Sequence, residues 1–339
     1  MADAGYDVLA GGLWFDQELA RRDILLSEGK KWRFQPIVDF RPEKTFKNIF
    51  YRLKRRLAKE LFRRAKIFTP ELLGYGIREI SSFARKYKAD LTIVHSEEGL
   101  WVGDRLLREG FNTGVDFEDW FSESFVQDES YTPFNKLKEL ERRLAVNCKY
   151  CLTMSRAMAK AIAGAYQAKP PEVVYNVFPW AERDSIDQKI KDRKDLGVVS
   201  LNWFSQNIGK GRGLDVLMLA LRHIKVPLEI HLRGNYPEPT RRWFEPLIPA
   251  DWRGRVFIHS TVPNTELLSR IAEHDIGLAL ESDNCLNRTF SVSNKLMQYL
   301  LAGLGVIAFD IPGQREILSD YPDVGIMVPV NDPLALARA

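Results

Sequence analysis

The chain has 339 residues, of which 45% are hydrophobic and 28% are charged, a composition typical of a soluble protein with two domains of about 150 residues each. No run of about 20 apolar residues occurs, which excludes a transmembrane helix, and we expect no signal peptide. The three cysteines are too few for a disulfide framework and indicate a reducing cytoplasm. Cys148 and Cys151 form a lone CxxC pair, which we interpret as buried thiols and not as a metal site.

Positive charge is concentrated in one segment. The net charge is +4, and residues 43–66 carry ten Lys or Arg and two Glu, or +8, so the remainder of the chain carries −4. This local distribution argues against diffuse nucleic-acid affinity, and we expect no nucleic-acid partner.

Short β-branched runs alternate with helical stretches, which predicts an α/β fold with parallel sheets. The strands of the first series are predicted at 7–10, 35–39, 91–95, 113–117, 151–154 and 172–176. Those of the second series are predicted at 198–204, 228–233, 255–259, 276–280 and 305–309. The polar, proline-interrupted segment between the series predicts a linker at 181–196, which joins a domain of residues 1–180 to one of residues 197–339.

The segment 46–61 is strongly amphipathic. Its apolar residues fall on one helical face, and Arg and Lys fill the other; the apolar set is Phe46, Ile49, Phe50, Leu53, Leu57 and Leu61. Two interpretations stay open: an interfacial helix that adsorbs to anionic lipid, or a helix packed on the N-terminal sheet with a solvated basic face.

Polar side chains end or follow two neighbouring strands of the first series. His95 ends one strand with Glu97 close behind, and Glu118 and Asp119 follow the next. Ligands of open α/β sheets bind at the carboxyl ends of the strands, where a carboxylate can orient or deprotonate an acceptor hydroxyl. The alternative is a structural histidine beside solvated loop acids.

A glycine-rich turn follows the strand at 198–204. Gly209, Gly211 and Gly213 precede a helical stretch, an arrangement in which backbone N–H groups and the helix dipole can hold a phosphate. The turn matches neither a Walker A loop nor the full dinucleotide fingerprint, and a mere tight turn is the alternative. Lys210 and Arg212 favour the phosphate, because they supply counter-charge.

A polar cluster begins the helix predicted at 295–301. Ser291 or Ser293 can act as an N-cap without a ligand, but neither is followed by the Glu or Gln that a capping box requires. Lys295 in the first turn opposes the helix dipole, which favours anions there. A bound anion would compensate for the missing capping box and would balance the charge of Lys295, so the pattern predicts a phosphate site.

The segment that follows this polar cluster resembles part of a known protein family. Residues 294–308, NKLMQYLLAGLGVIA, resemble the "P-x-K-L-x-E-Y-x-A-x-G-x-P-V-I-A" segment of glycosyltransferase family four. Further likenesses in the same order are found at 89–95, 115–119, 151–155, 212–220, 256–262 and 266–279. The family implies an α/β GT-B fold, in which two Rossmann-like domains face each other across a cleft. It also implies sugar transfer with retention from a nucleoside-diphosphate sugar, without a cofactor or bound metal. No Asp-x-Asp motif occurs in the chain, as this implies.

The resemblance also implies roles for particular residues. Lys295 and Arg212 would be cations at the donor diphosphate, and Gly211 and Gly213 would let the backbone approach it. The N–H donors would be Ser291, Val292, Ser293 and Asn294. The acceptor side would carry Gly11, Gly12, His95 and Glu97, with Glu118 and Asp119 as catalytic carboxylates.

The sequence departs from the family in several places. Phe290 and Gln298 stand where the family commonly has two glutamates, although Gln298 can still hydrogen-bond a ribose hydroxyl. Substitutes for the missing carboxylates are available in the preceding loop, as Glu281, Asp283 and Asn284. Near the start, either residues 7–12 form a short first strand with a glycine-rich loop, or the strand is missing and residues 14–20 already begin the first helix. The last helix is also shorter than is usual in the family.

We therefore expect a hexosyltransferase of polysaccharide or glycolipid synthesis that is cytoplasmic and peripheral at the inner membrane face. Its partners would be a nucleotide-sugar, a glycan or lipid-linked acceptor, and an anionic membrane surface contacted through residues 46–66. The alternatives are a non-catalytic GT-B protein that binds nucleotide or sugar, a sugar-nucleotide epimerase, and a lipid-binding scaffold.

Overall fold

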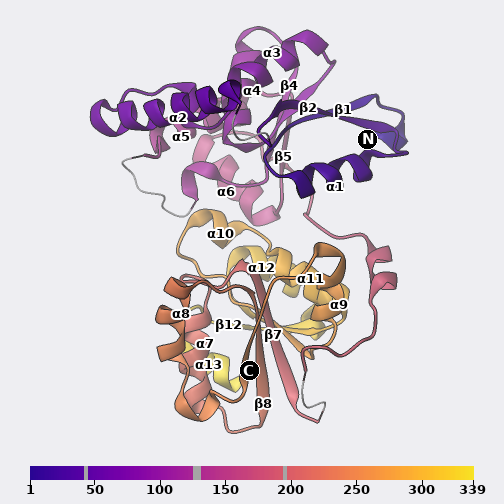
Figure 1. Ribbon diagram of the computed structural model, residues 1–339, viewed down its shortest axis with the longest axis vertical. Helices are drawn as coiled ribbons and strands as arrows, with labels where there is room; N and C mark the ends of the chain where they lie inside the picture. The colour runs from indigo at the N-terminus through magenta and orange to yellow at the C-terminus, as the bar shows by residue number, and fades with distance from the viewer. Residues whose placement is uncertain (42–44, 125–130, 194–196) are drawn as a thin grey trace. The chain divides into compact units, whose positions relative to one another are not determined.

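The computed structural model describes residues 1–41, 45–124, 131–193 and 197–339. The chain divides into two compact units (Figure 1). The first comprises Met1–Ser122, Val126–Leu152 and Ile162–Glu172, and the second comprises Glu123–Phe125, Thr153–Ala161 and Val173–Ala339. The domain bounds of 1–180, 181–196 and 197–339 stay a prediction. Among the described residues, no helix is long and apolar enough to cross a membrane.

A parallel two-stranded sheet begins the chain. β1 (Val8–Trp14) pairs with β2 (Trp32–Asp39), and α1 (Gln17–Ser27) follows β1. The first strand is therefore present, and it is longer than predicted. Gly11 and Gly12 lie within β1 and not in a loop. A Cβ at Gly11 would lie 2.8 Å from the Phe83 ring, so close side-chain packing accounts for this glycine.

A second sheet has the strand order β3-β4-β5-β6. Its strands are β3 (Thr92–Val94), β4 (Thr113–Phe117), β5 (Tyr150–Thr153) and β6 (Glu172–Val173). The helices of this half are α2 (Phe46–Ala65), α3 (Ile77–Tyr87), α4 (Ser96–Arg108), α5 (Phe134–Asn147) and α6 (Arg156–Tyr166). The carboxyl end of β3 leads directly into α4, which places His95 and Glu97 at the end of this strand.

The second unit contains a six-stranded parallel sheet of order β12-β11-β10-β7-β8-β9. Its strands are β7 (Val199–Asn207), β8 (Leu228–Asn235), β9 (Val256–His259), β10 (Ile276–Ala279), β11 (Gly305–Phe309) and β12 (Gly325–Val328). The five predicted strands are confirmed to within a few residues. β12, which pairs with β11 at the edge of the sheet, was not predicted.

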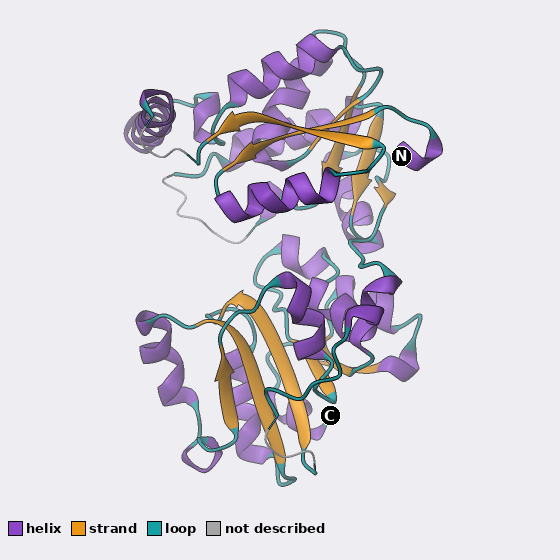
Figure 2. Cartoon of the chain, turned by 45° about the vertical axis from the view of Figure 1, so that its right-hand side comes forward, coloured by secondary structure: helices purple, strands orange, loops and turns teal. Residues whose placement is uncertain are grey.

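Helices cover both faces of this sheet (Figure 2). Successive strand residues point to opposite faces; accordingly, Ile307 of β11 packs in one core with Leu214, while its neighbour Val306 packs in another with Tyr299. The first core includes residues of α7 (Leu214–Ala220), α8 (Glu238–Phe244) and α13 (Pro333–Arg338), and the second includes residues of α9 (Asn264–Ile271), α11 (Asn294–Ala302) and α12 (Pro312–Leu318). The unit is a doubly wound, Rossmann-like domain.

The segment that we interpreted as a linker is tied to the second unit. The carboxylate of Asp187 accepts two hydrogen bonds from the guanidinium of Arg270, at 2.6 and 2.7 Å. The carboxylate of Glu273 accepts the backbone N–H groups of Lys191 and Asp192, at 2.8 and 2.7 Å. Residues 187–192 therefore pack against α9 and the turn after it.

Candidate functional site

The strand order of the second unit reverses between β7 and β10. The chain proceeds outward from β7 through β8 to β9, and on the other side from β10 through β11 to β12. In open α/β sheets, ligands bind outside the carboxyl ends of the strands at such a switch point. Two connections leave the sheet there: the glycine-rich turn (residues 208–213) after β7, and the 280–293 loop after β10.

Hydrogen bonds hold these two connections together. The carbonyl of Gly211 accepts one bond from the hydroxyl of Ser282 at 3.2 Å and another from the guanidinium of Arg288 at 3.0 Å. Ser282 and Arg288 both belong to the 280–293 loop, in which α10 (Leu286–Phe290) is a short helix that was not predicted. These two hydrogen bonds from the 280–293 loop, which leads to α11, therefore hold the glycine-rich turn in place.

Two glycines of the turn adopt left-handed backbone conformations. Gly211 has φ +69° and Gly213 has φ +74°. A Cβ at Gly213 would lie 2.5 Å from Cβ of Leu280 and 2.6 Å from its carbonyl oxygen, and a Cβ at Gly211 would lie 2.9 Å from the amide nitrogen of Asn284. Within the described part of the chain, no backbone N–H between Gly209 and Gly213 donates a hydrogen bond. These N–H groups can therefore donate to an anion.

Besides the exposed Lys210, three partly or fully buried cations and one carboxylate lie at or near the turn. Arg212 is half-buried, and loss of solvation followed by the positive charge of Arg288 lowers its pKa, while Glu281 acts in the opposite direction. Lys295 is buried and its ammonium group is paired with Glu281. Three positive charges against one negative charge leave an excess that suits a diphosphate. Arg288 was not among the predicted site residues, because the stretch around it was predicted as a loop.

The prediction that Lys295 needs a bound anion to balance its charge is wrong. Lys295 needs no ligand to balance its charge, because Glu281 already does so. Ser293 is the N-cap, and its hydroxyl accepts the N–H of Lys295 at 3.2 Å. The carboxylate of Glu281 also accepts the buried amide of Gln314 at 3.3 Å. The diphosphate role of Lys295 stays a prediction.

The other residues predicted around α11 lie as follows. Ser291 donates through its hydroxyl to the carbonyl of Asn287 at 2.6 Å; Val292 is buried, and Asn294 is the exposed first residue of α11. Gln298 is buried one turn after Lys295, and its side-chain oxygen has no hydrogen-bond partner among the described residues. This orphaned acceptor suits a ligand hydroxyl.

The positions around Phe290 are closely packed. A Cβ at Gly313, in the first turn of α12, would lie 2.1 Å from the carbonyl oxygen of Ser291 and 2.8 Å from that of Phe290. The hydroxyl of Ser155 donates to the carbonyl of Phe290 at 2.5 Å. Phe290 therefore contributes a backbone acceptor to this packing, at a position where the resembled family commonly has a glutamate.

A recess of about 480 Å³ opens beside the carboxyl ends of β8 and β9. Asn235 and Tyr236 line it on one side, and Ser260 and Thr261 on the other. It adjoins the glycine-rich turn, because the N–H of Ile208 donates to the carbonyl of Asn235 at 3.1 Å. Its volume lies in the range of small-molecule sites. This recess was not predicted from the sequence, since its lining comes from two separate strand ends.

In the first unit, two predicted acceptor-side residues, His95 and Glu97, follow β3, and the predicted carboxylates Glu118 and Asp119 follow β4. His95 is the N-cap residue of α4, and its ring nitrogen Nδ1 lies 3.4 Å from the carboxylate of Asp116. Burial, reinforced by the nearby Glu98, raises the pKa of Glu97 to about 7, while Arg55 opposes this shift. Loss of solvation also raises the pKa of Glu118, although that side chain keeps an exposed face.

Two of the predicted acceptor-side residues are not part of this acidic group. The Cβ positions of Gly11 and Gly12 face the side chains of Phe83, Ile37 and Phe34. Asp119, by contrast, contributes to the raised pKa of both Glu97 and Glu118 and therefore lies near them.

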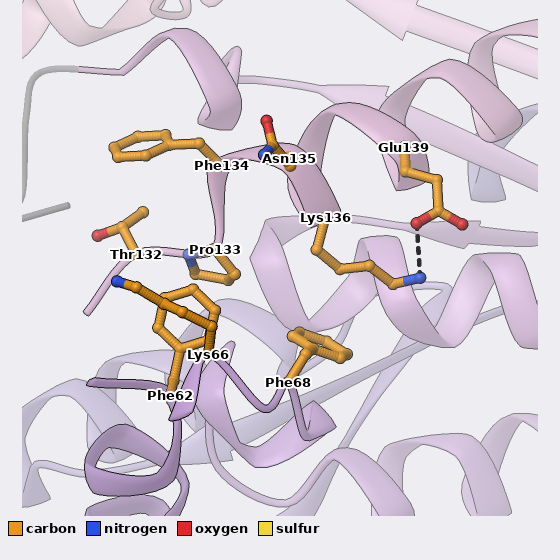
Figure 3. A pocket seen from close by; sticks show the side chains of 9 residues that line it. All are labelled: Phe62, Lys66, Phe68, Thr132, Pro133, Phe134, Asn135, Lys136 and Glu139. Carbon is orange, nitrogen blue, oxygen red and sulfur yellow. Dashed lines mark hydrogen bonds and ion pairs between the residues drawn. The ribbon is translucent and has the colours of Figure 1, made fainter. Parts of the chain in front are cut away.

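A further recess of the first unit, of about 680 Å³, is lined by none of the predicted site residues (Figure 3). Among the described residues, no cluster of three or more His, Cys, Asp or Glu has the arrangement of a metal site.

Part of the chain is similar to a known protein family. Residues 203–339 match the family described as Glycosyl transferases group 1. This range contains both the glycine-rich turn and α11. No curated protein matches the chain.

Solved structures match over nearly the whole chain. HepE of Anabaena in complex with UDP is 16% identical, with a TM-score of 0.64, and the match covers 98% of this chain and 88% of that one. Sucrose-phosphate synthase of Thermosynechococcus elongatus is 15% identical, with a TM-score of 0.63 and coverage of 100% and 86%. A Listeria monocytogenes protein assigned as a UDP-N-acetylglucosamine 2-epimerase is 10% identical, with a TM-score of 0.55 and coverage of 98% and 86%. The chain has the GT-B fold.

Proposed function

We propose that the protein transfers a sugar from a nucleoside-diphosphate sugar to a hydroxyl acceptor. The observation that carries this proposal is the excess of positive charge beside unbonded backbone N–H groups at the switch point of the second unit. These groups lie within the residues that match Glycosyl transferases group 1. HepE of Anabaena, which shares the fold, was solved with UDP and with UDP-glucose, which favours a UDP-sugar as the first donor to test.

The site would act mainly on the leaving group. Negative charge builds on the departing diphosphate, and donors fixed in place before the reaction stabilise it. Arg212, Arg288 and the N–H groups of the glycine-rich turn would supply these donors, together with the first turn of α11. The recess beside Asn235 and Thr261 would hold the nucleoside. In this mechanism the protein meets the charge itself and no metal is required, as in the retaining family four enzymes that the sequence resembles.

The acidic group of the first unit would bind the acceptor. Glu118 and Asp119 would orient its hydroxyl, and Glu97, with a pKa of about 7, is suited to accept a proton at neutral pH. We propose a glycan or lipid-linked acceptor and a hexose as the transferred sugar, with the protein located in the cytoplasm at the inner membrane face.

Two other functions have a specific observation in their favour. A non-catalytic nucleotide-binding protein fits the absence of carboxylates at Phe290 and Gln298. An epimerase fits the similarity to the Listeria monocytogenes protein, because the same fold serves both chemistries.

One assay separates these functions. The purified chain is incubated with UDP-, GDP-, ADP- and dTDP-sugars in the presence of EDTA, with and without octyl glucoside as an amphiphilic acceptor. We expect one donor to release its nucleoside diphosphate faster when the acceptor is present, with formation of a glycosylated product. Nucleotide binding without diphosphate release would indicate the non-catalytic protein, and interconversion of the donor sugar without acceptor would indicate the epimerase.

A further inference from the structure

Helix α2 exposes its apolar face to solvent. The exposed fractions are 94% for Phe46, 59% for Leu53 and 58% for Leu57. The complete apolar stripe consists of Phe46, Ile49, Phe50, Leu53, Leu57 and Leu61, all of which are exposed. Of the two interpretations that the sequence left open, packing of this stripe on the sheet is wrong.

A different and narrower face attaches α2 to the first unit. Asn48, Tyr51 and Ala58 are its buried residues. The side-chain amide of Asn48 donates to the carbonyl of Asp39 at 3.1 Å, and the Tyr51 ring meets Phe40 edge-on at 5.4 Å. The helix is therefore held in place without its apolar stripe, which remains available for a partner.

Cations flank the stripe along both edges. Residues of a helix are spaced by about 100° around the axis, which places Lys47 and Lys54 along one edge. The opposite edge carries Arg52, Arg56, Lys59 and Arg63. The only acidic residue of α2 is Glu60, which is already paired with Arg63 and Arg64. The ammonium group of Lys54 lies 4.3 Å from the centroid of the Phe50 ring, so its stem covers apolar surface while its charge stays outside.

We propose that α2 docks the protein on an anionic membrane surface, with the apolar stripe at the boundary between headgroups and acyl chains. The 20 residues of α2 span about 30 Å, and an apolar face edged by cations along this length is the form of an interfacial helix. A protein partner that covered the same stripe would have to desolvate the flanking cations, which is costly without matched acids. This proposal does not depend on the proposed sugar transfer.

The recess shown in Figure 3 lies at the end of α2. Phe62 and Lys66 of this end line the recess together with Phe68 and Lys136. The Lys66 ammonium lies 5.0 Å from the centroid of the Phe62 ring, and that of Lys136 lies 5.7 Å from the centroid of Phe68. The spacing of about 100° per residue places Phe62 on the side of α2 away from the apolar stripe, and Lys136 is paired with Glu139 of the same recess at 2.8 Å. The recess is therefore not part of the proposed membrane surface.

Vesicle sedimentation tests the proposal. The whole chain is mixed with phosphatidylcholine vesicles that contain about 30% phosphatidylglycerol or none, and the bound fraction gives a partition coefficient. We expect the partition coefficient for the anionic vesicles to be at least about tenfold higher than that for the neutral vesicles. Replacement of Leu53→Glu together with Leu57→Glu should reduce this binding about tenfold or more. Replacement of Arg52→Gln together with Arg56→Gln should also reduce it about tenfold, without changing the weak binding to neutral vesicles.

The matched control is on α1. Leu25 and Leu26 are 57% and 63% exposed, like Leu53 and Leu57, but they lie outside the basic segment. Leu25→Glu together with Leu26→Glu should leave vesicle binding within about twofold of the wild type. Thermal midpoints check that each variant is folded, as expected for exposed positions.

Three results would overturn the proposal: equal binding to both kinds of vesicle, equal losses in the α1 and α2 variants, or a wild-type dimer that the α2 variant dissociates while no vesicle binding occurs. The last would make the stripe an interface between copies. UDP binding, measured in parallel, reports on the donor site, so its failure would count against the proposed function and not against the membrane surface.

Discussion

Lys295, in the first turn of α11, forms an ion pair with Glu281, which follows β10. Both side chains are largely buried, with exposed fractions of 11% and 18%. The pair connects the two elements on either side of the 280–293 loop and therefore positions the start of α11 beside the glycine-rich turn.

Removal of either partner leaves a largely buried charge unbalanced. We expect Glu281→Gln to lower the free energy of unfolding by about 2 kcal/mol, somewhat less than for a fully buried pair. Lys295→Ala should have a similar effect, and the double variant Lys295→Met with Glu281→Gln should recover most of the loss. Urea unfolding of the two single variants and the double variant measures these changes in the free energy of unfolding. A Glu281→Gln protein as stable as the wild type would show that the pair contributes nothing.

Lys295→Ala should also weaken UDP binding about tenfold, or 1.4 kcal/mol. The variant removes a cation and leaves the carboxylate of Glu281 uncompensated near the diphosphate. Titration calorimetry measures the dissociation constant. Since the double variant with Glu281→Gln restores the charge balance without the cation, we expect it to remain weaker than the wild type. Unchanged affinity in the single variant would remove Lys295 from the site.

Arg288 holds the carbonyl of Gly211 and adds positive charge beside Arg212. We expect Arg288→Ala to weaken UDP binding about tenfold. Arg222, exposed on η5 (Leu221–His223), is a matched control whose replacement by Ala should leave affinity unchanged. Equal affinities for the two variants in the same titration would argue against a binding role for Arg288.

Gly213 combines a left-handed backbone with a close approach to Leu280. Gly213→Ala should lower the free energy of unfolding by about 3 kcal/mol or more, since the backbone conformation costs about 1 kcal/mol and overpacking adds to it. Gly303 has φ +88° but only ordinary contacts at its Cβ position. Gly303→Ala should therefore cost only about 1 kcal/mol. Denaturant unfolding compares the two, and similar losses would exclude overpacking at Gly213.

His274 makes the second unit sensitive to acid. Burial, followed by the nearby positive charge of His231, lowers the pKa of His274 to about 2. The unfolded chain binds this proton near pH 6.5 and the folded chain does not. Stability should therefore fall as pH drops below about 6.5, by about 1.4 kcal/mol per pH unit for this group. His274→Gln should flatten the pH dependence between about pH 6.5 and 4.5 by this amount. His223→Gln, at an exposed position, is the control and should leave the pH dependence of stability unchanged.

The second unit was largely predictable from the sequence. Its strands are β-branched runs bounded by loops, and Gly303 ends α11 with φ +88° as a helix C-terminal glycine commonly does. β12 was the strand of this unit that was not predicted.

The details of the site were less predictable. α10 is only five residues long, so the approach of Arg288 to Gly211 could not be foreseen. Glu281 and Lys295 are 14 positions apart, on separate elements, and their pairing depends on how α11 packs on the sheet. The helical pattern of α2 likewise cannot show whether its apolar stripe packs on the protein or faces a membrane, and burial of Asn48 and Tyr51 in place of the stripe could not be foreseen.

Direct titration of nucleoside diphosphates into the whole chain tests the central claim most directly. Calorimetry with UDP, GDP, ADP and dTDP at neutral pH should show one of them, most simply UDP, binding with one site per chain, and the affinity should fall as salt screens the cations. If none of the four nucleoside diphosphates binds to the folded protein, the account of a donor site at the carboxyl ends of β7 and β10 is contradicted.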